Sequence, residues 1–283
     1  MIPHYISVIG SQEIRDLEHD TLIAVEWFGY NFMKLNRDKC HFIFAGNCEQ
    51  AMHIKIGKVV IWESKIEQLL GINIDKKLSF KYHVTNLCKK ANKKLTALFR
   101  IGRFHTLIQK RIIMKSFIES QFGYSPLVWM FHNRGVNNEI NKIHERLLRF
   151  VYCDFNNTFE ELLSIDNSLT IHHRNIHLLA LEIFKVKKGI SNRIVENIFP
   201  THSTGYNTRS TRDNFLNPKV STTHYGHDTL AYFGPKIWEI LPEFIKNSKD
   251  VSTFKTNIKF WKPSCPCRLC KFYLPGVGYI NVI

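Results

Sequence analysis

Apolar positions recur at helical spacing between residues 11 and 35, and this pattern predicts a helix with Ser11 as its N-cap. Four short apolar runs follow, and turn residues between them favour strands over a continuous helix. Gly57 and Lys58, between two of the runs, are typical of a two-residue hairpin turn. The first third of the chain is therefore expected to hold one helix and a small antiparallel sheet. The predicted strands cover residues 40–45, 52–56, 59–62 and 69–74.

From residue 80 onward the apolar positions follow a helical period. A basic helix over residues 80–99 is expected to bury one apolar stripe, with its lysines largely off that stripe. Ser191 is a candidate cap for a short helix ending near Phe199, and Pro235 is compatible with the start of another. The apolar stripe consists of Phe80, Val84, Leu87, Ala91, Leu95 and Leu98. The later helices are predicted at residues 106–121, 138–153, 169–188, 229–241 and 254–261.

These patterns predict an α+β fold, in which a small antiparallel β piece is followed by a basic, mainly α-helical region. Residues 200–223 are rich in Ser, Thr, Asn and Gly and predict a long loop within the helical part. The expected regions are 1–75 (the β piece), 76–155 (basic helices), 156–262 (further helices with the long loop) and 263–283 (a Cys-rich tail).

The charge of the chain indicates the kind of partner that it binds. The 39 Lys and Arg residues outnumber the 24 Asp and Glu residues, which gives a formal net charge of +15 and favours a polyanionic partner. Between residues 76 and 115 there are twelve Lys or Arg residues and no Asp or Glu, so this run has no acidic partners of its own. A solvated charged face is the alternative interpretation. The candidate nucleic-acid-binding residues are Lys76, Lys77, Lys81, Lys89, Lys90, Lys93, Lys94, Arg100 and Arg103.

The seven cysteines are an odd count with no disulfide spacing, which indicates a reducing, intracellular compartment, either the nucleus or the cytoplasm. No run reaches the roughly 20 apolar residues needed to span a bilayer, so no membrane partner is expected. Three cysteines near the C-terminus are close enough to bind zinc, with His224 or His227 as the fourth ligand; otherwise they are reduced thiols. This candidate zinc site consists of Cys265, Cys267 and Cys270.

Several longer segments resemble, in order and spacing, the reverse transcriptases of jockey-type non-LTR retrotransposons. The first two are LEHDTLIAVEWFGYNFMKLNRDKCHFIFAG and LLGINIDKKLSFKYHV, which are similar to the part that follows the catalytic hairpin of these enzymes. Later segments are similar to the C-terminal region of the same family. They read SPLVWMFHNR, INKIHERLLRFVY, YNTRS, YFGPKIWEILP and CPCRLCKFYLPGVGYI.

The resemblance implies that residues 1–75 form the end of a palm domain, that residues 69–78 form a primer grip, and that the basic helices form a thumb. It also implies a role for Lys39, which corresponds to a lysine that protonates the leaving pyrophosphate; the alternative is an ordinary surface lysine. The family binds Mg²⁺ through carboxylates that the resemblance places upstream of residue 1, and the sequence contains no Asp-Asp pair.

The expected function is therefore that of a truncated, inactive polymerase remnant that has no cofactor of its own and still binds RNA or RNA–DNA duplex. The missing polymerase half or another protein would be a further partner. One alternative is a domesticated protein-interaction module without nucleic-acid function, and another is an enzyme completed by an upstream half. The sequence contains neither a Gly-x-Ser-x-Gly nucleophile motif nor a Gly-rich phosphate loop, so it does not favour another enzyme class.

Overall fold

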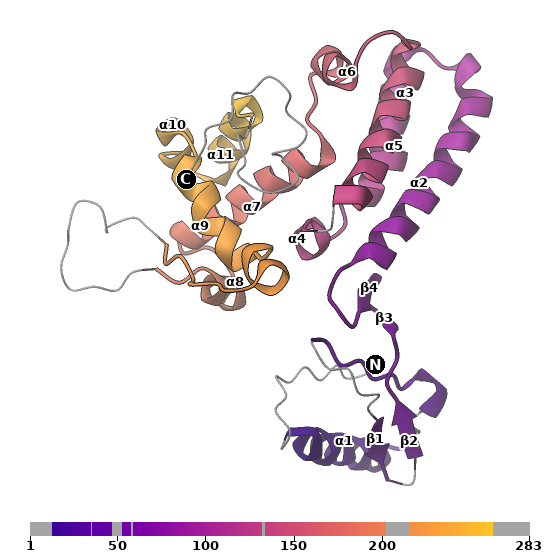
Figure 1. Cartoon of the computed structure of the whole chain (residues 1–283), viewed down its shortest axis with the longest axis vertical. Coiled ribbons are helices and arrows are strands. Elements are labelled where there is room, and N and C mark those ends of the chain that lie inside the picture. Colours follow the sequence, from indigo (N-terminus) through magenta and orange to yellow (C-terminus); the bar gives the residue numbers. More distant parts are fainter. Residues whose placement is uncertain are drawn as a thin grey trace, which may run out of the picture. The chain divides into compact units, whose positions relative to one another are not determined.

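The computed structural model describes residues 13–34, 36–46, 53–57, 59–131, 134–201 and 215–262 (Figure 1). Helices dominate, and the four strands of these residues form two separate antiparallel hairpins, which confirms the α+β class. Contacts divide the chain into two compact units, Met1–His83 and Val84–Ile283. Residues on both sides of the expected boundary at residue 155 belong to the second unit.

The N-terminal unit contains one helix and both hairpins. The backbone N–H of Lys55 donates a 2.7 Å hydrogen bond to Oε1 of Glu18, which joins the first hairpin to the helix. Phe42, Ile54 and Ile72 are its buried apolar side chains among the described residues. The elements are α1 (Glu13–Tyr30), the 3₁₀ turn η1 (Arg37–Lys39), β1 (His53–Ile56), β2 (Val59–Trp62), β3 (Ile66–Leu69) and β4 (Ile72–Asp75).

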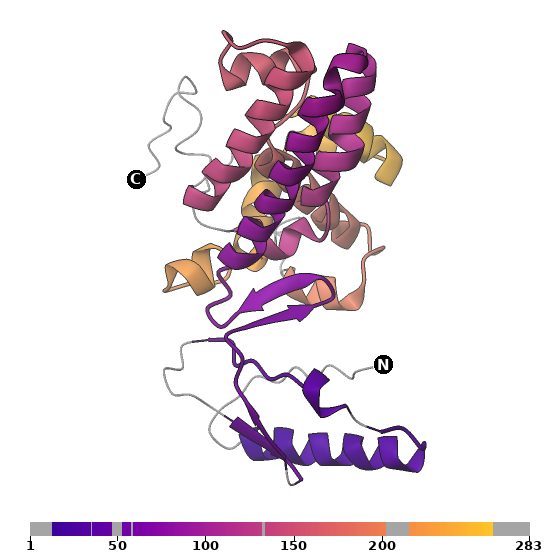
Figure 2. The ribbon, with the colours of Figure 1, turned by 90° about the vertical axis from the view of Figure 1, so that its right-hand side faces the viewer.

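The β1–β2 hairpin confirms the turn predicted at Gly57, whose φ is +60°; Lys58 lies outside the described residues. The strand predicted over residues 69–74 is wrong, because this run is split by the turn of a second hairpin (Figure 2). Leu70 and Gly71 both have positive φ, 48° and 84°, as a tight turn between twisted strands requires. The apolar run hid this turn, since a leucine is not expected in the left-handed region.

Two further predictions for this unit are corrected. The strand expected at residues 40–45 is reduced to one bridge, in which Phe42 pairs with Glu63. The helix α1 ends at Tyr30, five residues before the predicted end, and Phe32 beyond it has a φ of 56° and is fully exposed. Ser11, the expected N-cap, lies outside the described residues.

The C-terminal unit holds the remaining helices, and α2 begins at Lys81, three residues before the division between the units. None of the described helices has both the length and the apolar character needed to cross a membrane. The elements are α2 (Lys81–Ile101), η2 (Gly102–Phe104), α3 (Leu107–Ile113), the π-helix η3 (Met114–Ile118), η4 (Glu119–Phe122), α4 (Pro126–Trp129), α5 (Arg134–Tyr152), α6 (Phe159–Asp166), α7 (Ile171–Lys187), α8 (Arg193–Ile198), the π-helix η5 (Thr223–His227), α9 (Leu230–Ile240), α10 (Glu243–Lys246), α11 (Val251–Asn257) and η6 (Ile258–Phe260).

The main apolar core of this unit surrounds α7, which contacts α9 and α11 (Figure 1). The ring of Phe184 stacks on that of Phe254, with 4.4 Å between the centroids. Gly234 is required at its place in α9, because a Cβ there would lie 2.2 Å from the ring of Phe199. This core joins α7, α8, α9, α10, α11 and η6 to one another and to Met130 at the end of α4.

The helix predicted over residues 106–121 is divided into α3, η3 and η4. Most of its apolar residues are exposed, namely Leu107, Ile108, Ile112 and Phe117. The sequence reasoning also missed α6. Its signal was present, since Thr158 and Glu161 form a reciprocal capping box at the start of this helix.

Two predicted helix starts are wrong in detail. The side chain of Asn192, not Ser191, caps α8 by accepting a hydrogen bond from the backbone N–H of Ile194. Pro235 lies inside α9 and not at its start. The helix predicted at residues 169–188 is confirmed, and Gly189 follows it with a φ of +65°, as a left-handed stop requires.

Candidate nucleic-acid interface

Helix α2 places its apolar and its charged residues on opposite faces. Val84, Ala91 and Leu95 of the predicted stripe have no exposed surface. On the other side Lys89, Lys93 and Arg100 are exposed, and their spacing of four and seven residues aligns them along one face of the helix. We call these three residues the α2 stripe.

One flank of α2 meets α5, which runs beside it (Figures 1 and 2). Nη1 of Arg146 on α5 donates a 3.0 Å hydrogen bond to Oδ1 of Asn92 on α2. The same guanidinium lies 5.9 Å from the ring centre of Phe99. This flank therefore presents a cation beside an exposed aromatic ring.

The other flank of α2 meets the π-helix η3. Nζ of Lys94 donates a 3.2 Å hydrogen bond to the carbonyl oxygen of Phe117 and lies 4.3 Å from the centre of its ring. Lys94 is therefore engaged in packing two helices together, unlike the three residues of the α2 stripe.

Basic residues of α3 and η3 pair with a carboxylate that is distant in sequence. Nε of Arg111 lies 2.8 Å from Oδ1 of Asp166, and Nζ of Lys115 lies 3.8 Å from Oδ2. The hydroxyl of Tyr152 donates a 2.7 Å hydrogen bond to the same carboxylate, and burial together with this bond raises the pKa of Tyr152 to about 12. The Asp166 side chain is fully buried. Arg111 and Lys115 thus neutralise a carboxylate inside the fold.

A second buried carboxylate, Glu119, joins three helices. Nη1 of Arg174 lies 2.5 Å from Oε2 of Glu119, and Nε2 of His144 lies 3.4 Å from Oε1. Burial by itself would raise the pKa of Glu119, but His144 and the charge of Arg174 outweigh it and lower that pKa to about 2. Burial lowers the pKa of His144, so the imidazole is held neutral. This cluster stabilises the packing of α5 against η4 and α7.

The other candidate residues belong to both units of the chain. Nζ of Lys76 lies 3.0 Å from Oε1 of Glu63, so Lys76, like Arg111 and Lys115, pairs with an acidic residue that lies outside the basic run. The guanidinium of Arg103 lies 4.7 Å from the ring centre of Phe104. Lys77, Lys81 and Lys90 are exposed.

Lys39, the candidate for protonating the leaving group, is exposed on η1. Its backbone N–H donates a 3.2 Å hydrogen bond to the carbonyl oxygen of Asn36, which closes the turn. Its catalytic role stays a prediction.

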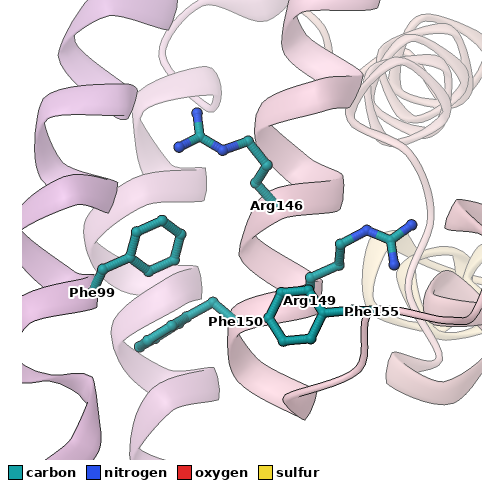
Figure 3. A pocket seen from close by; sticks show the side chains of 5 residues that line it. All are labelled: Phe99, Arg146, Arg149, Phe150 and Phe155. Atoms are coloured by element: carbon teal, nitrogen blue, oxygen red, sulfur yellow. The ribbon is translucent and has the colours of Figure 1, made fainter.

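A cavity of about 350 Å³ opens between α2 and the C-terminal end of α5 (Figure 3). Figure 3 shows Phe99 and Phe150 pointing toward one another from the two helices, with Phe155 on the loop that follows α5. Sequence reasoning missed this site, because its residues are about 50 positions apart. The available signal was two arginines and two phenylalanines within ten residues at and after the end of α5. The lining residues are Phe99, Arg146, Arg149, Phe150 and Phe155.

The predicted zinc site at Cys265, Cys267 and Cys270 lies outside the described residues. Within the described ranges, no group of three or more His, Cys, Asp or Glu side chains is arranged to hold a metal ion. His177, which shares a helix face with His173, uses Nε2 in a 2.9 Å contact with the carbonyl oxygen of Trp261 and stacks on its ring. Nε2 of His177 is therefore already engaged within the fold.

Comparisons of the chain with protein-family models, with curated proteins and with solved structures find no match. The function is therefore inferred from the α2 stripe, from the cavity beside it and from the residues that surround both.

Proposed function

We propose that this chain binds RNA or RNA–DNA duplex without reading its sequence, through phosphate contacts made by the α2 stripe. The resemblance to jockey-type reverse transcriptases supports a thumb-like role for this helix, within a C-terminal part of such an enzyme that does not polymerise by itself. A partner of this kind agrees with a location in the nucleus or the cytoplasm.

The observation that carries this proposal is the exposed, aligned and unbalanced charge of the stripe. Among the described residues, no salt bridge involves Lys89, Lys93 or Arg100. At 1.5 Å of rise per residue, Lys89 and Arg100 are about 16 Å apart along the helix. This length corresponds to roughly five nucleotides of one strand at 3.4 Å each. A polynucleotide strand lying along α2 would neutralise all three cations.

The test compares two triple variants with the same change in net charge. The first carries Lys89→Ala, Lys93→Ala and Arg100→Ala. The control carries Lys255→Ala, Lys259→Ala and Lys262→Ala, which remove exposed lysines from α11, η6 and the residue after Trp261. Binding of a fluorescent 20-base-pair RNA–DNA hybrid is measured by anisotropy at several salt concentrations.

We expect the stripe variant to lose about 10- to 100-fold in affinity, and the slope of log K against log salt to fall by about 2–3. The control variant is expected to lose much less at the same salt concentration. Equal losses in the two variants would show that net charge alone matters and would overturn the proposed interface.

The proposal assigns no polymerase activity to the chain, in agreement with the absence of an Asp-Asp pair from its sequence. Primer extension with Mg²⁺ or Mn²⁺ is the direct measurement, and no incorporation above background is expected. Incorporation that depends on the protein would contradict this part of the proposal.

A protein-interaction module is the second candidate function. The observation in its favour is a group of exposed apolar side chains on η2, α3 and η3, because exposed apolar surface is a feature of interfaces. Size-exclusion chromatography with light scattering tests it, using the variant Ile108→Asp. A larger species in the wild type that becomes a monomer in the variant, without loss of hybrid binding, would support an interface. The group consists of Phe104, Leu107, Ile108, Ile112 and Phe117.

A further inference from the structure

Two walls of the cavity beside α2 are aromatic rings that the fold holds in place. The rings of Phe99 and Phe150 are 5.0 Å apart and inclined by 54°. Phe150 also lies against the backbone of Gly102, where a Cβ would come within 2.0 Å of its ring, and Nζ of Lys110 lies 5.0 Å from its centre. These contacts fix Phe150, while Phe99 keeps two-fifths of its surface exposed.

The third ring, Phe155, is 77 % exposed although it is large and apolar. The loop that carries it is ordered by Asp154, whose Oδ1 accepts hydrogen bonds of 3.0 and 3.1 Å from the backbone N–H groups of Asn156 and Asn157. These bonds lower the pKa of Asp154. Phe155 is therefore held at the cavity by a structured turn, and its ring remains available for contact with another molecule.

The polar groups of the cavity are cationic. Arg146 is exposed and uses Nη1 to reach Asn92, which leaves other guanidinium donors for an anion. Arg149 is paired with Glu145 at 2.6 Å and also donates from Nη1 to the carbonyl oxygen of Asp154 at 3.4 Å. Because Glu145 is occupied by Arg149, Arg146 provides the uncompensated positive charge at the edge of the cavity.

We propose that this cavity takes one unpaired nucleobase of a nucleic-acid strand lying along α2. The base stacks on Phe99 and Phe155, and Arg146 donates to a neighbouring phosphate. A volume of about 350 Å³ is at the small end of ligand pockets and suits a single nucleotide but not a duplex. Aromatic rings beside cations are the arrangement by which proteins bind single strands without sequence preference.

The inference rests on the proposed function, because the strand must first be held by the α2 stripe. Phe99 and Arg146 connect the two sites. Phe99 lies on the same helix as the stripe, one residue before Arg100, and Arg146 contacts that helix through Asn92. The cavity would give the chain a preference for the junction between duplex and single strand, a property that the stripe by itself does not provide.

The experiment compares a blunt 16-base-pair RNA–DNA hybrid with the same hybrid carrying a three-nucleotide DNA extension at its 5′ or 3′ end. The first unpaired base is 2-aminopurine, whose emission falls when it stacks. We expect one extended hybrid to bind about 5- to 30-fold more tightly than the blunt one, with reduced emission from the bound base. Phe99→Ala and Phe155→Ala are expected to abolish the preference and to restore the emission.

Phe260→Ala is the matched control, because Phe260 is also a highly exposed phenylalanine, at 81 %, and lies on η6. It should keep the preference. Circular dichroism checks the fold of each variant, and Phe155→Ala removes a side chain with little packing to lose.

If the blunt and extended hybrids bind equally, with the expected salt dependence, the cavity inference is wrong and the proposed function stands. If neither hybrid binds, both are wrong. If the preference exists but survives in Phe99→Ala and Phe155→Ala, the base is held elsewhere and the inference is overturned.

Discussion

The basic run between residues 76 and 115 divides into two parts with different surroundings. On α2, the residues Lys89, Lys93 and Arg100 face solvent and take part in no salt bridge among the described residues. On α3 and η3, the residues Arg111 and Lys115 lie against the fully buried carboxylate of Asp166. Neither part contains an acidic residue of its own, so the local sequence gives no sign of the difference.

The difference separates cations that stabilise the fold from cations that are available to a partner. A buried carboxylate needs its counter-charge, because burying an ion without a partner is costly. An exposed lysine contributes little to stability but adds to the attraction for a polyanion. The two parts should therefore respond in opposite ways to substitution, with stability depending on Asp166 and binding on α2.

Asp166→Ala should produce the largest loss of stability. It removes the partner of Arg111 and Lys115 and the acceptor of the Tyr152 hydroxyl, so we expect the free energy of unfolding to fall by about 3 kcal/mol. Urea denaturation followed by circular dichroism measures it. Glu160→Ala, an exposed acid on the same helix, is the control and should cost less than about 1 kcal/mol. A similar loss of stability in both variants would mean that the buried pairing of Asp166 contributes no more than an exposed acid.

Acid should weaken the fold through Glu119 and His144. The pKa of Glu119 is lowered to about 2 from 4.5, so its contribution is present above pH 4.5 and is lost as the pH falls toward 2. That contribution is about 3 kcal/mol. Burial also lowers the pKa of His144, so the unfolded chain gains a proton first and stability already declines below pH 6.5.

The measurement is the free energy of unfolding between pH 7 and pH 2.5. Glu119→Gln should flatten its decline below pH 5, while Glu160→Gln should leave the decline as in the wild type. An unchanged pH profile in Glu119→Gln would show that other carboxylates dominate acid unfolding.

Gly102→Ala tests the contact between α2 and α5 and should lower the stability less than the changes at Asp166 and Glu119. The added Cβ would lie 2.0 Å from Cζ of Phe150, so the ring must move, and overpacking of this kind costs about 1–3 kcal/mol. Gly123→Ala is the control, because its Cβ would meet its nearest neighbour, the Ser120 carbonyl oxygen, at 3.4 Å. Urea midpoints compare the two, and an equal shift would contradict the close approach at Gly102.

Features defined by neighbouring residues were predictable. The buried stripe of α2, the β1–β2 hairpin and the stop at Gly189 each follow from spacing or from a glycine with positive φ. The β3–β4 turn was missed because Leu70 adopts a left-handed conformation that its side chain disfavours. The π-helix η3 was missed because nothing in an apolar, helical pattern marks an extra residue in a turn.

In the candidate site, too, only features set by neighbouring residues were predictable from the sequence. The exposure of Lys89 and Lys93 follows from their position opposite the apolar stripe of α2. The pairing of Arg111 with Asp166 joins residues 55 positions apart, and so does the contact of Arg174 with Glu119. The cavity likewise depends on how α2 meets α5. Such contacts are set by tertiary packing, which the period of a single helix does not contain.

The smallest expected change in stability belongs to Lys89→Glu, and it gives the sharpest test of the difference between the two parts. A glutamate at position 89 would face Lys93 one turn later, which replaces a repulsive i,i+4 pair by an attractive one and should stabilise the fold by about 0.4–1 kcal/mol. The same variant should bind an RNA–DNA hybrid about 10-fold more weakly, because it removes one phosphate contact and repels the backbone. Thermal denaturation and hybrid anisotropy on one preparation measure both effects. A variant that loses stability and affinity together would show that Lys89 belongs with the structural cations after all.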